Sequence, residues 1–160
     1  MIQIDIVCVG KIKEGFYRDA IHEYAKRLSR YAKLEIREAE DEKTPDRASE
    51  KEEEQIKKRE GEKILKLIKD NSYVIALAID GAAYDSPSLA SHLQKLVNSG
   101  SGRLTFVIGG SLGLSREVLS RADEKLSFSD LTFPHQLMRV ILLEQIYRCF
   151  RIVNGEPYHK

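Results

Sequence analysis

The sequence predicts an α/β fold: a mostly parallel sheet of five or six strands with helices on both faces. Two observations support this. Apolar strand-like runs alternate five times with segments of helical periodicity. The run "YVIALAIDG" (73–81) is also apolar enough to be buried on both faces, as in a parallel sheet. With 160 residues, 42% of them apolar, the chain can bury a core, and we expect residues 1–160 to form one domain.

The individual elements follow from local signals. Strands are expected at 2–10, 33–39, 73–81, 103–110 and 125–129. Helices are expected over 14–31, after Ser49, from Ser86 to Gly100, from near Ser115, and from Pro134 to about Val153. Ser49 and Glu52 form a capping box, and Ser86 with Pro87 indicates an N-cap followed by a first-turn proline. Residues 40–48 are the expected flexible loop.

Composition and charge exclude several classes of protein. A net charge of +1 argues against a polycation that coats nucleic acid non-specifically. The two cysteines, Cys8 and Cys149, match no zinc spacing and are typical of buried thiols in a reducing compartment. No apolar run reaches the roughly 18 residues that span a bilayer. We therefore expect a cytoplasmic protein with no metal and no membrane partner.

Glycines mark the end of one predicted strand. In "FVIGGSLGLS" (106–115) an apolar run meets Gly109, Gly110 and Gly113 just before a helix, which indicates close approach of a ligand to the backbone. A dinucleotide fingerprint is one reading, with Asp130 as the ribose-binding acid, but the G-x-G-x-x-G spacing fails because Ile108 stands where a glycine is needed. A glycine turn without a ligand also remains open.

The predicted last helix carries two further signals. Its segment "LMRVILLEQI" is apolar around most of its circumference, which predicts either a homodimer contact or a deeply buried helix. His135 and Arg139 lie four residues apart near its start, where the helix dipole favours an anion. Each alone is also consistent with a structural residue. The tail adds Tyr158, His159 and Lys160, a ring, an imidazole and a cation that suit an RNA base and phosphate.

The segments "FVIGGSLGLS", "LSFSDLTFPHQLMRVILLEQIYRCFRI" and the terminal "PYHK" closely resemble the ribosomal large-subunit RNA methyltransferase H family, which belongs to the SPOUT class. The similarity starts at "VGKIKEGFYRDAIHEYAKRL" and covers the whole chain. It implies S-adenosylmethionine-dependent methylation of N3 of a pseudouridine in 23S ribosomal RNA, a homodimer, and a C-terminal trefoil knot. The implied cofactor contacts are Leu77, Gly109, Phe128, Ser129, Asp130, Leu131, Thr132 and Phe133.

The chemistry of this implied reaction suggests hypothetical roles for the polar residues. Arg139 would stabilise the base anion, and His135 or His159 would accept the N3 proton. Arg139, Tyr158, His159 and Lys160 would contact the RNA. Two alternatives stay open: a non-catalytic dimeric protein that binds RNA or assists ribosome assembly, and a nucleotide-binding oxidoreductase that uses the glycine loop.

Overall fold

A computed structural model describes all residues from 1 to 160. Its five strands are β1 (Ile2–Val9), β2 (Ala32–Ala39), β3 (Tyr73–Ala83), β4 (Arg103–Ile108) and β5 (Glu124–Ser127). Its five helices are α1 (Gly15–Leu28), α2 (Glu50–Leu67), α3 (Ser86–Asn98), α4 (Arg116–Arg121) and α5 (His135–Val153). The alternation of strands and helices predicted from periodicity is confirmed. None of the helices combines the length and the apolar composition that a membrane crossing requires.

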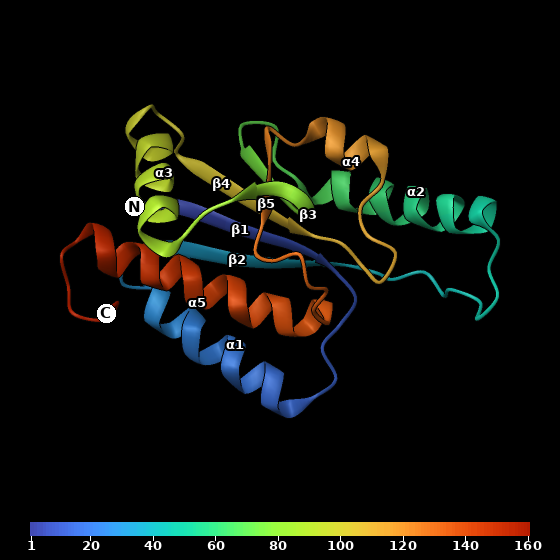
Figure 1. The fold of residues 1–160 in the computed structure, drawn as a ribbon, viewed down its shortest axis with the longest axis horizontal. Coiled ribbons are helices and arrows are strands. Elements are labelled where there is room, and N and C mark those ends of the chain that lie inside the picture. Colours follow the sequence, from blue (N-terminus) through green and yellow to red (C-terminus); the bar gives the residue numbers. More distant parts are fainter.

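The strands form one sheet in the order β2-β1-β4-β3-β5, and every neighbouring pair is parallel. Helices α1, α3 and α5 cover one face, and α2 and α4 cover the other (Figure 1). The order places β1 next to β4, and the helices that follow these two strands lie on opposite faces. This is a topological switch point, where parallel sheets bind ligands beyond the carboxyl ends of their strands.

Each face of the sheet has its own apolar core. The larger cluster joins the α1, α3 and α5 side and includes Phe106, Leu142 and Ile146. The smaller one lies under α2 and α4 and includes Val107 and Val118. Adjacent residues Phe106 and Val107 of β4 therefore point to opposite cores, as the period of a strand requires. Burial on both faces explains the nearly continuous apolar runs in the sequence.

Strand β3 departs from the prediction of burial on both sides. Val74, Ile75 and Ala76 are buried, but Ile79 is 53% exposed, and residues 78–81 lie outside the ladder before Ala82 and Ala83 pair with β5 again. The pairing with β5 shifts register between Leu77 and Ala82, which marks a bulge. The bulge turns residues 78–81 away from the core, and it brings Ala78 and Ile79 to the cavity at the carboxyl edge of the sheet.

Caps are partly as predicted. Both hydrogen bonds of the Ser49–Glu52 capping box are present. The prediction that Ser86 caps α3 is wrong, because the N-cap is Asp85, whose carboxylate accepts from the Ser88 N–H at 2.8 Å. The Ser86 hydroxyl instead donates to Gln145 of α5 at 2.8 Å. A carboxylate at the helix start also complements the helix dipole, which a serine does not.

Helix α5 lies between α1 and α3 and rests on the sheet, so its own chain contacts it on three sides (Figure 1). Leu142, Leu143 and Ile146 are at most 1% exposed. Intramolecular packing therefore accounts for much of the apolar circumference of this helix, which favours the second of the two interpretations drawn from the sequence. Gly155, with a φ of +65°, ends the helix and begins the tail.

Candidate cofactor pocket

The glycines after β4 form a tight turn. The N–H of Gly113 donates to the carbonyl of Gly110 at 3.1 Å, and Gly113 has a φ of +88°, a conformation that favours glycine. Gly109 needs its missing side chain for a different reason. A Cβ atom there would lie 2.9 Å from the backbone carbon of Gly113, so only glycine lets the turn fold back on the strand.

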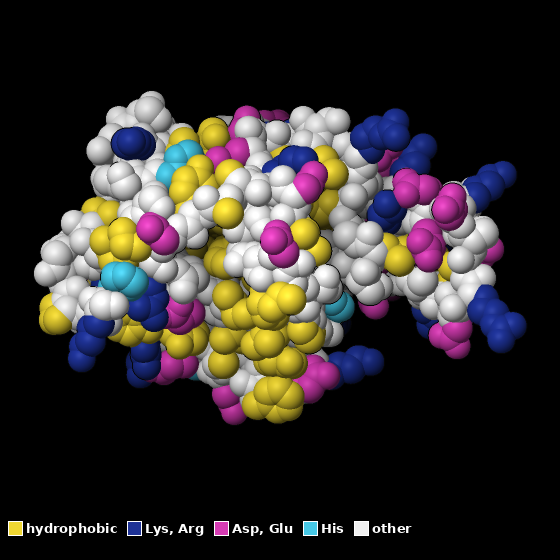
Figure 2. All heavy atoms as spheres, viewed as in Figure 1, with side chains coloured by type: hydrophobic (Ala, Val, Ile, Leu, Met, Phe, Trp, Pro, Cys, Tyr) yellow, Lys and Arg dark blue, Asp and Glu magenta, His cyan; other side chains and the backbone are white.

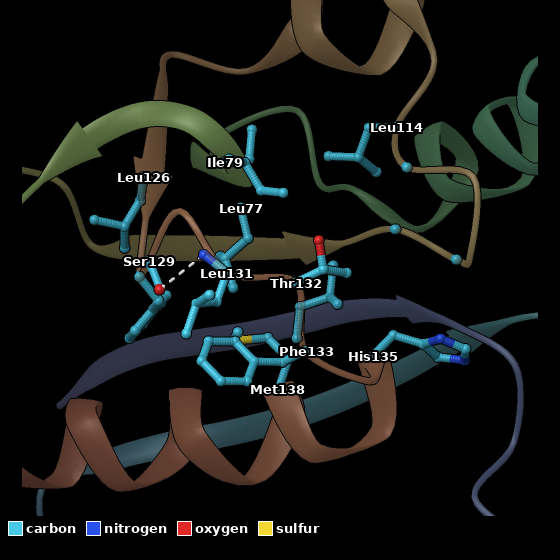
Figure 3. Close-up of a pocket in the computed structure, with 16 residues that line it drawn as sticks. Leu77, Ile79, Leu114, Leu126, Ser129, Leu131, Thr132, Phe133, His135 and Met138 are labelled. Carbon is cyan, nitrogen blue, oxygen red and sulfur yellow. Dashed lines mark hydrogen bonds between the residues drawn. The ribbon is translucent and has the colours of Figure 1, made fainter.

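This turn borders a cavity of about 170 Å³, which we call the glycine-turn pocket. Its walls come from the bulge of β3, the end of β4 with its turn, the segment after β5, and the first turn of α5 (Figure 3). The lining residues are Leu77, Ala78, Ile79, Ile108, Gly109, Gly110, Gly113, Leu114, Leu126, Phe128, Ser129, Leu131, Thr132, Phe133, His135 and Met138. Three strand ends thus converge where parallel sheets bind ligands.

The lining is mostly apolar and contains no lysine, arginine or carboxylate. Its polar groups are the backbone of the turn, the hydroxyls of Ser129 and Thr132, and the imidazole of His135. The Ser129 hydroxyl accepts from the N–H of Leu131 at 2.9 Å and so fixes the loop that closes one side of the pocket (Figure 3). A flat apolar ring fits such walls, and a pyrophosphate would meet no cation.

The pocket brings together nearly all the predicted cofactor residues. Asp130 is the exception: it is exposed and does not line the cavity. Its carboxylate is therefore not placed to bind a ribose in this pocket. Reasoning from sequence missed Ile79, Leu114 and Met138. Met138 was detectable in principle, because it lies three residues after His135 and so near the same face of α5.

His135 lies at one end of the pocket (Figure 3). Burial lowers the pKa of its imidazole, and the charge of Arg139 lowers it further. The α5 N-terminus acts in the same direction, because the helix dipole disfavours a cation there. The imidazole is therefore neutral at neutral pH and able to accept a proton.

Arg139 lies elsewhere. It is 2% exposed and does not line the glycine-turn pocket. Its Nη1 donates to Glu38 of β2 at 2.6 Å, and its Nη2 donates to the carbonyls of Val9 and Gly10 at 3.0 and 2.6 Å. The guanidinium thus closes the carboxyl end of β1. His135 and Arg139 were expected to act together from one face of the helix. In the structure His135 lines the glycine-turn pocket, whereas Arg139 bonds to the end of β1.

The tail packs on its own α5. The Tyr158 hydroxyl donates to Glu144 at 3.0 Å, and the guanidinium of Arg148 lies 4.7 Å from the centre of the Tyr158 ring. His159 Nδ1 lies 3.2 Å from Arg148 Nη1. Burial and the bond to Glu144 raise the pKa of Tyr158 to about 12, so its phenol stays protonated. Within one chain, none of the three tail residues lines the glycine-turn pocket.

A parallel α/β sheet with a glycine turn and an apolar pocket at its carboxyl edge defines a cofactor-binding α/β protein. Residues 2–159 match a family model described as "Predicted SPOUT methyltransferase". The chain is 62% identical to the ribosomal RNA large subunit methyltransferase H of Clostridioides difficile and 60% identical to that of Clostridium tetani. The protein of that name from Clostridium beijerinckii is 59% identical. Each comparison covers 99% of this chain and 100% of the relative. The chain therefore belongs to the ribosomal RNA large subunit methyltransferase H family of SPOUT methyltransferases.

Proposed function

We propose that this protein transfers a methyl group from S-adenosylmethionine to N3 of a pseudouridine in 23S ribosomal RNA. Membership of a family of ribosomal RNA methyltransferases over the full chain carries this assignment. The glycine-turn pocket supports the assignment independently, because it lies at the carboxyl edge of the parallel sheet, where this class of fold binds small molecules. A ribosomal substrate is consistent with a cytoplasmic location.

The residues of the pocket fit this cofactor. Apolar walls accept the adenine ring, and backbone groups of Gly109 and of the segment 128–133 are available for its polar edges. The absence of lysine and arginine from the lining means that a sulfonium cation meets no like charge. S-adenosylmethionine supplies an electrophilic methyl group. Leu77, Gly109, Phe128, Ser129, Leu131, Thr132 and Phe133 are the proposed contacts, and Asp130 contributes only through its place in the loop.

Methylation of N3 requires loss of the proton on that nitrogen. The neutral imidazole of His135 lines the pocket and is the proposed acceptor, with His159 as the second candidate. Arg139 is the proposed source of positive charge for the base anion. Its guanidinium is held by Glu38, Val9 and Gly10 and does not line the pocket, so within one chain its charge acts without direct contact with the pocket's ligand.

The assignment is tested with ribosomes from cells that lack the protein. The purified chain is expected to restore the missing methyl group on 23S ribosomal RNA, measured by mass spectrometry of nuclease fragments. Calorimetry is expected to show binding of S-adenosylmethionine and none of NAD. Ribosome binding without methyl transfer would favour the non-catalytic assembly protein, and binding of NAD would favour the oxidoreductase.

We also infer a homodimer and a C-terminal trefoil knot. Ile79 and Leu131 rim the pocket and are 53% and 70% exposed, and Phe16 at the start of α1 is 68% exposed. Figure 2 shows hydrophobic side chains gathered in one patch on this face. A second copy of the chain would cover such a patch.

The path of the chain supports the proposed knot. The segment 128–134 crosses from β5 at the sheet edge to α5, past the ends of β3 and β4.

In this dimer the tail of one chain serves the pocket of the other, and subunit exchange tests the arrangement. One inactive chain carries Gly109→Val, and the other is truncated after Glu156. Random pairing makes about half of the dimers mixed, each with one intact site, so about a quarter of wild-type activity should return. Exchange is confirmed by native mass spectrometry. If exchange occurs and activity stays absent, the tail serves its own chain.

A further inference from the structure

A second cavity lies beside the glycine-turn pocket and differs from it in charge. We call it the basic cavity; it has a volume of about 470 Å³. It is formed by the loop after β1, one side of α1 from Arg18 to Ala25, β2 and α5. The lining residues are Lys11, Ile12, Arg18, Ile21, His22, Ala25, Ile36, Glu38 and Arg139. Three permanent cations and one histidine thus surround the cavity, against a single carboxylate.

The one carboxylate is already neutralised, because Glu38 pairs with Arg139 at 2.6 Å. Lys11 and Arg18 are exposed, and neither forms a salt bridge; Arg18 donates only one long bond, of 3.4 Å, to the carbonyl of Ile12. Their charges are therefore free to act on a ligand. The Nε atom of the buried Arg139 also lacks a hydrogen-bond partner in the chain, although buried donors almost always have one.

The two cavities are neighbours at the same edge of the sheet. His135 borders the glycine-turn pocket, and Arg139 borders the basic cavity one helical turn later, about 6 Å along the α5 axis. The carboxyl end of β1 separates them, since its last carbonyls bind Arg139. A nucleotide whose base reaches the methyl group at the glycine-turn pocket therefore has its own backbone within reach of the basic cavity.

From this arrangement we propose that the basic cavity binds a backbone phosphate of the RNA substrate next to the methylated nucleotide. The inference rests on the proposed function for the identity of the RNA, but the charge and placement of the cavity stand by themselves. Phosphate contacts fix the register of a nucleic acid, whereas base contacts specify its sequence. Lys11 and Arg18 would bind and position the RNA without taking part in methyl transfer.

The test replaces each free cation by a neutral side chain. Lys11→Gln and Arg18→Gln are expected to raise KM for ribosomes several-fold, with kcat and the Kd for S-adenosylmethionine unchanged. Each lost phosphate contact should also reduce the slope of log KM against log salt by about one. Lys51→Gln, an equal charge change on the far face in α2, is the matched control and should leave KM and the slope as in the wild type.

Melting temperatures confirm that the variants are folded; Lys11 has no hydrogen bond or ion pair to lose. Variants that keep the wild-type KM and salt slope would overturn the proposal. A cavity that binds only free anions, and not the RNA, would give this same unchanged result. Failure of the proposed function has a different signature: the wild type then transfers no methyl group. Co-sedimentation with ribosomes still measures the salt slope in that case.

Discussion

The glycine-turn pocket and the basic cavity share one edge of the sheet but are built differently. The first is apolar, and its walls are turns directly after β4 and β5 together with the bulge of β3. The second is charged, and its cations come from α1, the loop before it and α5. Ligand binding at the first site therefore depends on backbone shape, and at the second on long charged side chains. Substitutions that change only one of these features should affect only one of the two sites.

The largest effect is expected at Gly109. Gly109→Val places side-chain atoms where the backbone of Gly113 already lies, since even a Cβ would be 2.9 Å from it. The turn must open, and overpacking of about 3 kcal/mol or more lowers S-adenosylmethionine affinity by more than about a hundredfold, so that binding should no longer be detected. Calorimetry measures the loss, and circular dichroism confirms the fold.

Gly102 provides the matched control for that variant. An added Cβ there meets no atom within 4 Å, and its φ is not positive, so Gly102→Val should bind S-adenosylmethionine normally. Normal binding by the Gly109→Val variant would mean that the cofactor does not use this turn.

The next largest effect is expected at Arg139, which belongs to the edge between the two cavities. Arg139→Ala should reduce methyl transfer about a hundredfold if its charge stabilises the base anion. It should also lower the free energy of unfolding by about 2 kcal/mol, because the buried carbonyl of Val9 and the partly buried carbonyl of Gly10 lose their donor.

Urea denaturation measures the stability, and turnover on ribosomes is measured where the variant is folded. Arg139→Lys keeps the charge but cannot bind Glu38 and both carbonyls at once, so it should remain impaired. A folded Arg139→Ala variant with full turnover would remove this residue from the mechanism and leave it a purely structural role.

The smallest effect concerns Glu60 of α2, which supports the loop behind the glycine turn. Its carboxylate accepts from the Glu42 N–H at 3.0 Å. Burial raises the pKa of Glu60, and the charges of Asp41 and Glu42 raise it further. Because the folded state holds this proton more tightly than the unfolded chain, stability should fall as pH rises from about 4.5 towards the raised pKa.

Glu60→Gln removes the titration and keeps an acceptor for the Glu42 N–H. Its free energy of unfolding relative to the wild type should therefore increase across that pH range, as measured by urea denaturation at several pH values. A difference that stays constant with pH would show that Glu60 ionises as it does in the unfolded chain.

The same contrast between the cavities explains why the sequence could predict one of them and not the other. The glycines after β4 and the helix start at Pro134 are local signals, and a parallel sheet brings its strand ends to the edge where both of them lie. The position of the glycine-turn pocket could therefore be predicted from local signals, whereas its individual cofactor contacts were implied by the family resemblance. The basic cavity could not, because Lys11, Arg18 and Arg139 are surface-type residues whose convergence depends on the packing of α1 against α5.

By itself the sequence determined the alternation of elements, the parallel sheet, the Ser49 cap and the family, because periodicity, turn chemistry and motifs are properties of short segments. Only the tertiary structure decided the strand order, the bulge in β3 and the side of α5 on which each polar residue acts. In the structure Arg139 bonds to the end of β1 and does not line the glycine-turn pocket, and Asp130 also lies outside this pocket. Such contacts join residues up to 130 positions apart, and no local pattern encodes which distant carbonyl a guanidinium will bind.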